Sequence, residues 1–234
     1  MRAIGSPGPV AGSGGLRGCF VTGTDTGVGK TVLSAALVAA LRARGGPVSA
    51  RKPVVTGLDD GPPLDHELLA ALSGEPPETV SPARYGPAVS PHLAAELARG
   101  KLDVEALIAD VRVATAPVIV EGVGGLLVPL APGWDVRRLA RELGLGVLIA
   151  SRPGLGTINH TLLSVEAARL AGLDLRAVVL TQWPTDPGTI ERSNRATIER
   201  LGEVEVATLP HLPELSPVAL AAAGAALPYE RWLS

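Results

Sequence analysis

Gly18-Cys-Phe-Val-Thr-Gly-Thr-Asp-Thr-Gly-Val-Gly-Lys-Thr31 is the stretch of sequence that decides the fold. Its first part, Cys19–Thr22, is a short apolar run that favours a strand, and Gly23–Gly29 is a loop of mostly Gly and Thr. Apolar residues then recur at helical spacing over Thr31–Arg44 and stop at a Gly pair. A loop of this kind directs several backbone N–H groups into one concavity, and the helix adds the positive end of its dipole. The stretch therefore predicts a phosphate-binding loop between a strand and a helix.

The end of this loop carries the side chains that a polyphosphate and its cation need. Lys30 is placed to reach the β and γ phosphates, and the Thr31 hydroxyl is placed to ligate Mg²⁺. The standard spacing requires its first Gly at position 24, but this chain has Thr24 there and a Gly one residue earlier. A Gly-rich turn that only caps a helix is the alternative interpretation. Because strand, loop and helix coincide, we favour a variant phosphate loop with nucleotide contacts at Thr26, Gly27, Val28, Gly29, Lys30 and Thr31.

The bulk composition fits one α/β domain and argues against several classes of partner. Of the 234 residues, 46% are hydrophobic, which is enough to bury a substantial core. We expect a disordered leader over 1–17, where Gly, Pro and Ser are frequent, and a single domain over 18–234. The net charge of −2 and the 3% aromatic content indicate neither a nucleic-acid nor a membrane partner. The single cysteine, Cys19, lies in the first predicted strand and suits a reducing cytoplasm.

The rest of the chain alternates between apolar runs and helical patterns. Strands are predicted at 48–55, 117–121, 146–151, 175–180 and 204–209, with a short extra strand at 126–130. Helices are predicted at 65–72, 91–98, 135–143, 157–170 and 188–201, the third with Asp135 as its N-cap. Apolar strands that alternate with helices predict a three-layer α/β fold, in which helices cover both faces of a mostly parallel sheet. Ligands of such sheets bind at the carboxyl ends of the strands.

Charged residues lie where this rule places a ligand. Lys52 falls in the second predicted strand, where it is either an edge residue facing solvent or a second cation for a strongly anionic transition state. Glu121 closes an apolar strand, where it either caps or hydrates a loop or ligates Mg²⁺. Asp65 starts a predicted helix, where an N-cap and a metal ligand are equally compatible with the local sequence.

Four segments together carry a resemblance to a known family. They are Gly23-Thr-Asp-Thr-Gly-Val-Gly-Lys-Thr31, Lys52-Pro-Val, Val120-Glu-Gly-Val-Gly-Gly125 and Gly154-Leu-Gly-Thr-Ile-Asn-His160. In this order and spacing they resemble dethiobiotin synthetase, a family of P-loop NTPase fold that acts in biotin synthesis, over nearly all of 20–182. Each segment alone is a weak signal, but the four together are specific.

The resemblance implies a site for ATP and Mg²⁺. It implies that the metal is held by Thr31, Asp65 and Glu121, and that Lys30 and Lys52 act in catalysis. The reaction it implies is the ATP-dependent ring closure of 7,8-diaminononanoate with CO₂. One amine becomes a carbamate, the carbamate takes the γ-phosphoryl group, and the second amine attacks the carbon and expels phosphate. Such a reaction needs positioning and cations more than a protein nucleophile.

Further positions follow from the same resemblance. Thr56 matches a hydroxyl position that contacts the substrate. The family is a homodimer in which a short segment of one subunit closes the substrate site of the other, and that segment here is Gly156, Thr157 and Asn159. The family's base-contacting Asn matches Thr181, whose hydroxyl is too short for a paired contact. We therefore expect relaxed selectivity for the base, unless Gln182 takes the role of the Asn.

Rival functions use similar loops. A partitioning or cell-division ATPase commonly has a basic tail or DNA-binding face, but the segment 216–234 is rich in Ala and has Arg231 as its only base. A cobyrinate-type amidating ligase carries a glutaminase domain in addition to this fold. The single cysteine of this chain, Cys19, lies in the first predicted strand and is not placed to act as a glutaminase nucleophile. A pure nucleotide-binding module is the remaining alternative.

Overall fold

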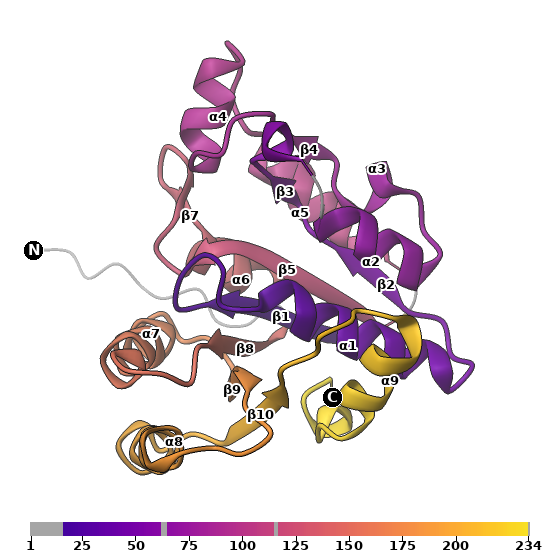
Figure 1. Ribbon diagram of the computed structural model, residues 1–234. Helices are drawn as coiled ribbons and strands as arrows, with labels where there is room; N and C mark the ends of the chain where they lie inside the picture. The colour runs from indigo at the N-terminus through magenta and orange to yellow at the C-terminus, as the bar shows by residue number, and fades with distance from the viewer. Residues whose placement is uncertain (1–15, 62–64, 115–116, 234) are drawn as a thin grey trace, which may run out of the picture.

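A central parallel sheet organises the computed structural model, which describes residues 16–61, 65–114 and 117–233. Within these residues six strands pair in the order β10-β9-β8-β1-β5-β2, and all the pairs are parallel (Figure 1). The strands are β1 (Gly18–Gly23), β2 (Ser49–Arg51), β5 (Val118–Gly125), β8 (Gly146–Ser151), β9 (Leu175–Trp183) and β10 (Val206–Pro210). The expected α/β architecture is confirmed.

Helices cover both faces of this sheet because side chains on a strand alternate between its faces. In β1, Cys19 and Val21 belong to one hydrophobic cluster and Phe20 to the other. The first cluster includes α1 (Lys30–Ala43), α2 (Asp65–Ser73), α3 (Pro77–Val80) and α9 (Pro217–Ala225). The second includes α4 (Pro91–Leu97), α5 (Val104–Arg112), α6 (Val136–Leu143), α7 (Thr157–Leu170) and α8 (Thr189–Gly202). Since β1 is shared, we propose that 18–234 forms one domain.

The helix after the phosphate loop is buried on more than one side. Helices α1 and α9 lie side by side in Figure 1, although most of the chain separates them in sequence. A Cβ added to Gly224 of α9 would lie 2.0 Å from the Ala36 carbonyl oxygen, so only Gly permits this approach. The chain after α9 continues through the short 3₁₀ turn Tyr229–Arg231 to Trp232, which is buried. The C-terminal segment therefore holds α1 against the sheet.

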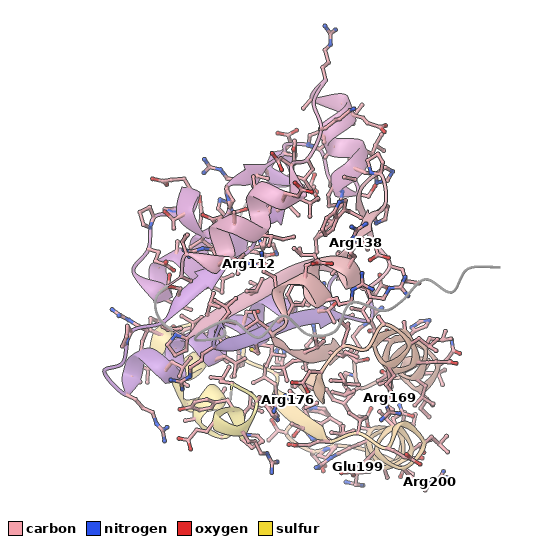
Figure 2. The ribbon with its side chains drawn as sticks, turned by 180° about the vertical axis from the view of Figure 1, so that it is seen from behind. Arg112, Arg138, Arg169, Arg176, Glu199 and Arg200 are labelled. Carbon is pink, nitrogen blue, oxygen red and sulfur yellow. The ribbon has the colours of Figure 1, made fainter. Side chains whose placement is uncertain are left out.

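On the side of the molecule that Figure 2 shows, arginine side chains connect neighbouring helices through hydrogen bonds. Arg112 of α5 donates to the Glu142 carbonyl oxygen of α6 at 2.8 Å. Arg169 of α7 donates to the Glu203 carbonyl oxygen after α8 at 3.0 Å. A cation at the last carbonyls of a helix also complements the negative end of its dipole.

The second predicted strand is interrupted, which corrects the expectation of one strand over 48–55. The chain leaves the central sheet after Arg51, because the Lys52 N–H donates to Val80 rather than to β5. Pro53 has no N–H for a ladder bond. The remaining part, β3 (Val54–Val55), pairs with β4 (Ala83–Arg84) in a small separate sheet.

Other differences are local. The extra strand expected at 126–130 is β6 (Pro129–Ala131), which pairs with β7 (Trp134–Asp135). Asp135 caps α6 as predicted, since its side chain accepts from the Arg138 N–H at 2.7 Å. Helices α3, α5 and α9 and the 3₁₀ turns Leu58–Asp60 and Tyr229–Arg231 were not predicted.

The N-terminal part of the chain gives one further correction. Residues 1–15 of the expected leader lie outside the described residues. Arg17 belongs to the fold, because its carbonyl oxygen accepts from the Val118 N–H at 2.8 Å. Among the described residues, no helix combines the length and apolarity that a membrane span requires.

Candidate active site

The loop between β1 and α1 has the conformation of a phosphate cradle. Gly27 and Gly29 adopt φ angles of 70° and 83°, in the left-handed region that favours Gly, and Gly29 is the residue before α1. The Lys30 ammonium donates to the Asp25 carbonyl oxygen at 2.9 Å, which folds its side chain along the loop. Burial lowers the pKa of Lys30 below its ordinary value, although the Glu121 carboxylate acts against this. The first residue of α1 is thus a cation held beside the loop's N–H groups.

A buried ionic cluster lies next to this loop. The Lys52 Nζ is 2.7 Å from Glu121 Oε1 and 2.5 Å from Asp65 Oδ2. Thr31 donates its hydroxyl to the same Glu121 oxygen at 2.9 Å. Lys52 is 4% exposed and Glu121 is 1% exposed, whereas the Asp65 side chain is 43% exposed. Four residues from distant parts of the sequence therefore meet, and neither Lys52 nor Glu121 is a solvent-facing residue.

Lys52 and Asp65 stabilise each other's charged forms. Burial alone would lower the pKa of Lys52, but the Glu121 and Asp65 carboxylates outweigh burial and raise it. Burial likewise opposes the charged form of Asp65, but Lys52 holds the pKa of Asp65 below its ordinary value. Lys52 is therefore an ammonium at neutral pH, and Asp65 is a carboxylate that pairs with it instead of capping α2.

The donor set fits Mg²⁺ in one specific respect. The second carboxylate oxygen of Glu121, Oε2, is buried and has no hydrogen-bond partner among the described residues. An acceptor of this kind is costly unless a cation or a donor satisfies it. Within the same residues no group of three or more His, Cys, Asp and Glu side chains forms a metal cage. Mg²⁺ commonly needs only one or two carboxylates, with substrate phosphates and water as the other ligands.

A cavity of about 690 Å³ opens over the loop and the cluster. Of the predicted residues, it is lined by Thr26, Gly27, Gly29, Lys30, Thr31, Lys52, Thr56, Asp65 and Gln182. Glu121 lies beneath this lining, bonded to Lys52 and Thr31. The lining of this cavity thus combines the loop at the N-terminus of α1, the end of β3 and the start of α2.

The remaining lining was not predicted. It comes from Val32 of α1, from Val55, Gly57 and Asp60 at and after the end of β3, from the segment 88–91 at the start of α4, and from Val123, Gly124 and Val128 around the end of β5. The sequence signal at 88–91 is Ser90-Pro91, a helix start with Pro at the first position, but nothing local places that start over the phosphate loop. Val55, Val123 and Val128 add apolar side chains to this lining.

The predicted segment Gly156, Thr157 and Asn159 lies outside this cavity. Thr157 lines a neighbouring cavity of about 280 Å³, and its hydroxyl is 2.7 Å from that of Ser151. Gly156 and Asn159 are exposed at the start of α7, and Leu155 beside them is 96% exposed. Within one chain these residues do not reach the ionic cluster's cavity.

Thr181 differs from the expectation that it faces a nucleotide base. It is 1% exposed, and its hydroxyl donates to the Val28 carbonyl oxygen of the loop at 2.5 Å. Gln182 has a φ of 51°, is exposed, and lines both cavities. The left-handed conformation after Thr181 turns the next side chain toward the site, so Gln182 is the better placed of the two to meet a ligand.

Comparison with solved structures supports the fold alone. The chain has a TM-score of 0.51 with the signal recognition particle receptor FtsY from Elizabethkingia anophelis in complex with GDP, at 14% sequence identity. The match covers 94% of this chain and 67% of that one.

Comparison with protein families and curated proteins identifies the family. A family model described as an AAA domain matches residues 17–219. An ATP-dependent dethiobiotin synthetase from Anaeromyxobacter sp. (strain Fw109-5) is 43% identical over 208 residues, which are 86% of this chain and 93% of that protein. One from Mycobacterium avium (strain 104) is 45% identical, over 81% of this chain and 85% of that protein. The chain belongs to the family of ATP-dependent dethiobiotin synthetases.

Proposed function

We propose that this chain, an ATP-dependent ligase of biotin synthesis by its family, closes 7,8-diaminononanoate with CO₂ to the cyclic urea dethiobiotin, with ADP and phosphate as the other products. The observation that carries the proposal is the buried Lys52, Glu121 and Thr31 cluster beside the loop cation Lys30. Two ammonium groups face one cavity, which suits a reaction whose transferred group is strongly anionic.

The bond changes follow from the chemistry of the substrates. One amine of the diamine adds to CO₂ and loses a proton to give a carbamate. A carbamate oxygen attacks the γ-phosphorus of ATP and releases ADP, which gives a mixed carbamic–phosphoric anhydride. The second amine then attacks the anhydride carbon, loses a proton and expels phosphate, which closes the ring. Each step needs the reacting atoms to be held close and in line.

The chain's own residues would bind the triphosphate and position the reacting atoms. Backbone N–H groups of the loop and the dipole of α1 bind the triphosphate, and Lys30 lies at the loop end that would meet the β and γ phosphates. Lys52, kept charged by Glu121 and Asp65, is placed to stabilise negative charge that develops on the carbamate and the phosphoryl oxygens. Thr31, Asp65 and Glu121 would hold Mg²⁺, which neutralises phosphate charge when it is bound.

The shape of the cavity supports a diamine with a long apolar chain. Val55, Val123 and Val128 contribute apolar side chains to its lining, and Thr56 contributes to the same lining. An aliphatic chain gains by burial against such side chains, while the amines stay near the ionic cluster.

We further propose a homodimer in which the start of α7 completes the partner's site. Gly156, Leu155 and Asn159 are exposed on this chain and do not line its own large cavity. Leu155 is 96% exposed on the single chain, so a partner that covered this segment would bury an apolar side chain. The unpaired Cys19, buried in β1, is compatible with the cytoplasmic location that the sequence predicts.

Mass spectrometry tests the proposed function. The purified chain is mixed with 7,8-diaminononanoate, ¹³C-bicarbonate, Mg²⁺ and ATP, with parallel reactions that lack one component each. We expect a cyclic urea that carries the ¹³C label and forms in proportion to ADP. If the rate of ATP hydrolysis is the same with and without the diamine and no cyclic urea forms, the proposal is overturned in favour of a switch ATPase.

A further inference from the structure

The end of β9 is in direct contact with the phosphate loop. Thr181 is buried, and its hydroxyl is 2.5 Å from the Val28 carbonyl oxygen and 3.2 Å from the Ser151 carbonyl oxygen. Val28 belongs to the loop, and Ser151 is the last residue of β8. A hydroxyl has one proton to donate, and the shorter distance assigns it to Val28. One side chain thus connects the loop to the carboxyl ends of the strands β8 and β9.

Thr181 also packs against the next residue of the loop. A Cβ added to Gly29 would lie 2.8 Å from the Thr181 oxygen and 2.9 Å from its Cβ, so the loop rests directly on this side chain. Gly29 has a φ of 83° and precedes Lys30, the first residue of α1. The position of Thr181 therefore fixes where the loop turns into the helix and where Lys30 begins.

The opposite end of the loop contacts the neighbouring strand, β8. The Thr24 N–H donates to the Ala150 carbonyl oxygen at 3.0 Å, and the Thr24 hydroxyl lies 3.4 Å from that of Ser151. Thr24 occupies the position at which the standard loop spacing has a Gly. The loop is thus held at both ends by groups at the carboxyl edge of the sheet.

We propose that Thr181 is a positioning residue for the phosphate loop and does not read the nucleotide base. The proposal rests on the proposed function only in that the loop binds a nucleoside triphosphate. Thr181 fixes the Val28 carbonyl and Gly29, and so keeps the loop's N–H groups directed at the phosphates before a ligand arrives. Every triphosphate has the same phosphates, so the effect of Thr181 is the same for all four bases. Base selectivity belongs to other residues, of which Gln182 is the exposed neighbour.

Hydroxyl removal with conserved shape tests this role. Thr181→Val keeps the packing on Gly29 and leaves the Val28 carbonyl without its donor, whereas Thr181→Ser keeps the hydroxyl. Thr22→Val is the matched control, because Thr22 is also buried next to the loop but its hydroxyl has no hydrogen-bond partner within the described part of the chain. Binding of ATP, CTP, GTP and UTP with Mg²⁺ is measured by calorimetry on the full chain, without the diamine.

We expect Thr181→Val to weaken the binding of all four triphosphates by a similar factor of about tenfold. Thr181→Ser is expected to restore most of the affinity, and Thr22→Val is expected to bind as the unaltered chain does. A loss confined to ATP would overturn the proposal, because Thr181 would then read the base. Wild-type affinity in Thr181→Val, or an equal loss in Thr181→Ser, would overturn it too.

Two safeguards keep the result interpretable. Circular dichroism and thermal unfolding check that each variant is folded, and Thr181→Ala compared with Thr181→Ser gives the same contrast if the valine variant is not. The binding measurement requires no ring closure, whereas the proposed function is judged by the cyclic urea that the unaltered chain makes. Failure of one is therefore distinguishable from failure of the other.

Discussion

Arg51 and Lys52 are neighbours in the chain, and each is a buried cation held by two carboxylates, yet they occupy two different kinds of site. Arg51 lies 2.8 Å from Glu75 and 3.2 Å from Asp110, which joins β2 to the chain after α2 and to α5. Both Glu75 oxygens are engaged, one by Arg51 and one by the Ala50 N–H. Lys52 instead lies at the large cavity, and its partner Glu121 keeps one oxygen without a partner among the described residues.

The difference shows what marks a functional ion pair in this molecule. Burial and pairing are common to both clusters, so neither property identifies the site. Each cluster has one buried side-chain atom without a hydrogen-bond partner among the described residues, Arg51 Nε and Glu121 Oε2. Arg51 Nε still pairs with the Asp110 carboxylate at 3.2 Å, whereas Glu121 Oε2 is a carboxylate oxygen in the cluster that borders an open cavity and a phosphate loop. The cluster around Arg51 uses a planar guanidinium, which is suited to fixed structural pairing.

The largest expected difference between the two cations is in turnover. Lys52→Met is expected to lower kcat by about 10²–10³, because it removes a cation that acts on developing charge. Arg51→Met, the matched change one residue earlier, is expected to leave kcat of the folded protein within about threefold. Steady-state kinetics with ATP and the diamine compare them. An effect of Lys52→Met on KM alone would make Lys52 a binding residue.

The carboxylates give the second contrast. Glu121→Gln is expected to raise the Mg²⁺ concentration needed for half-maximal activity by about 10- to 100-fold, because an amide is a poor substitute for a ligating carboxylate. Glu75→Gln changes a carboxylate of the other cluster and is expected to leave the Mg²⁺ requirement unchanged. Activity measured over a Mg²⁺ titration decides this, and equal Mg²⁺ dependence in the two variants would remove Glu121 from the metal site.

Stability gives a third test, which concerns the cluster around Arg51. Arg51→Met leaves Glu75 and Asp110 without their cation, and both carboxylates are only partly exposed. We expect a loss of about 1–3 kcal/mol in the free energy of unfolding, below the cost of a fully buried unpaired charge. Thr31→Val, which alters the site side of the molecule, is expected to abolish turnover and keep the fold. Urea denaturation measures the free energy of unfolding of Arg51→Met. An unchanged midpoint in this variant would refute a structural role for Arg51.

The smallest expected signal concerns the partner subunit. Asn159→Ala and Lys52→Met are each expected to be inactive, but a mixture that exchanges subunits is expected to recover about a quarter of the wild-type activity, since one site of each heterodimer is intact. Native mass spectrometry confirms the exchange. If heterodimers form and no activity returns, Asn159 acts in its own subunit's site.

Local periodicity predicted the elements with strong patterns and failed where tertiary contacts decide. The strand Gly146–Ser151 and the helix Thr157–Leu170 agree with the predicted bounds, because both have clear apolar patterns and Gly or polar boundaries. The run through Lys52 is apolar enough to suggest one strand, but the bond from Lys52 to Val80 diverts the chain. The helix Val104–Arg112 was missed although Asp103 caps it.

The candidate site divides in the same way. Lys30, Thr31 and the loop could be found from spacing, because the motif itself encodes the geometry. Lys52, Asp65 and Glu121 could be suggested from strand ends and the family resemblance, but their mutual distances depend on three separate segments meeting. Nothing in the local sequence indicates that the segment 88–91 lines the cavity or that the Thr181 hydroxyl donates to Val28, so only the structure reveals these two contacts.

The oxygen atoms of CO₂ give the most direct test of the proposed reaction. In the mechanism above, the carbamate oxygen that takes the γ-phosphoryl group leaves with phosphate when the ring closes. A rapidly quenched reaction with freshly dissolved C¹⁸O₂ is therefore predicted to give one ¹⁸O in the phosphate for each labelled cyclic urea, as read by mass spectrometry. Cyclic urea that forms while the phosphate carries no ¹⁸O would contradict the anhydride and the function built on it.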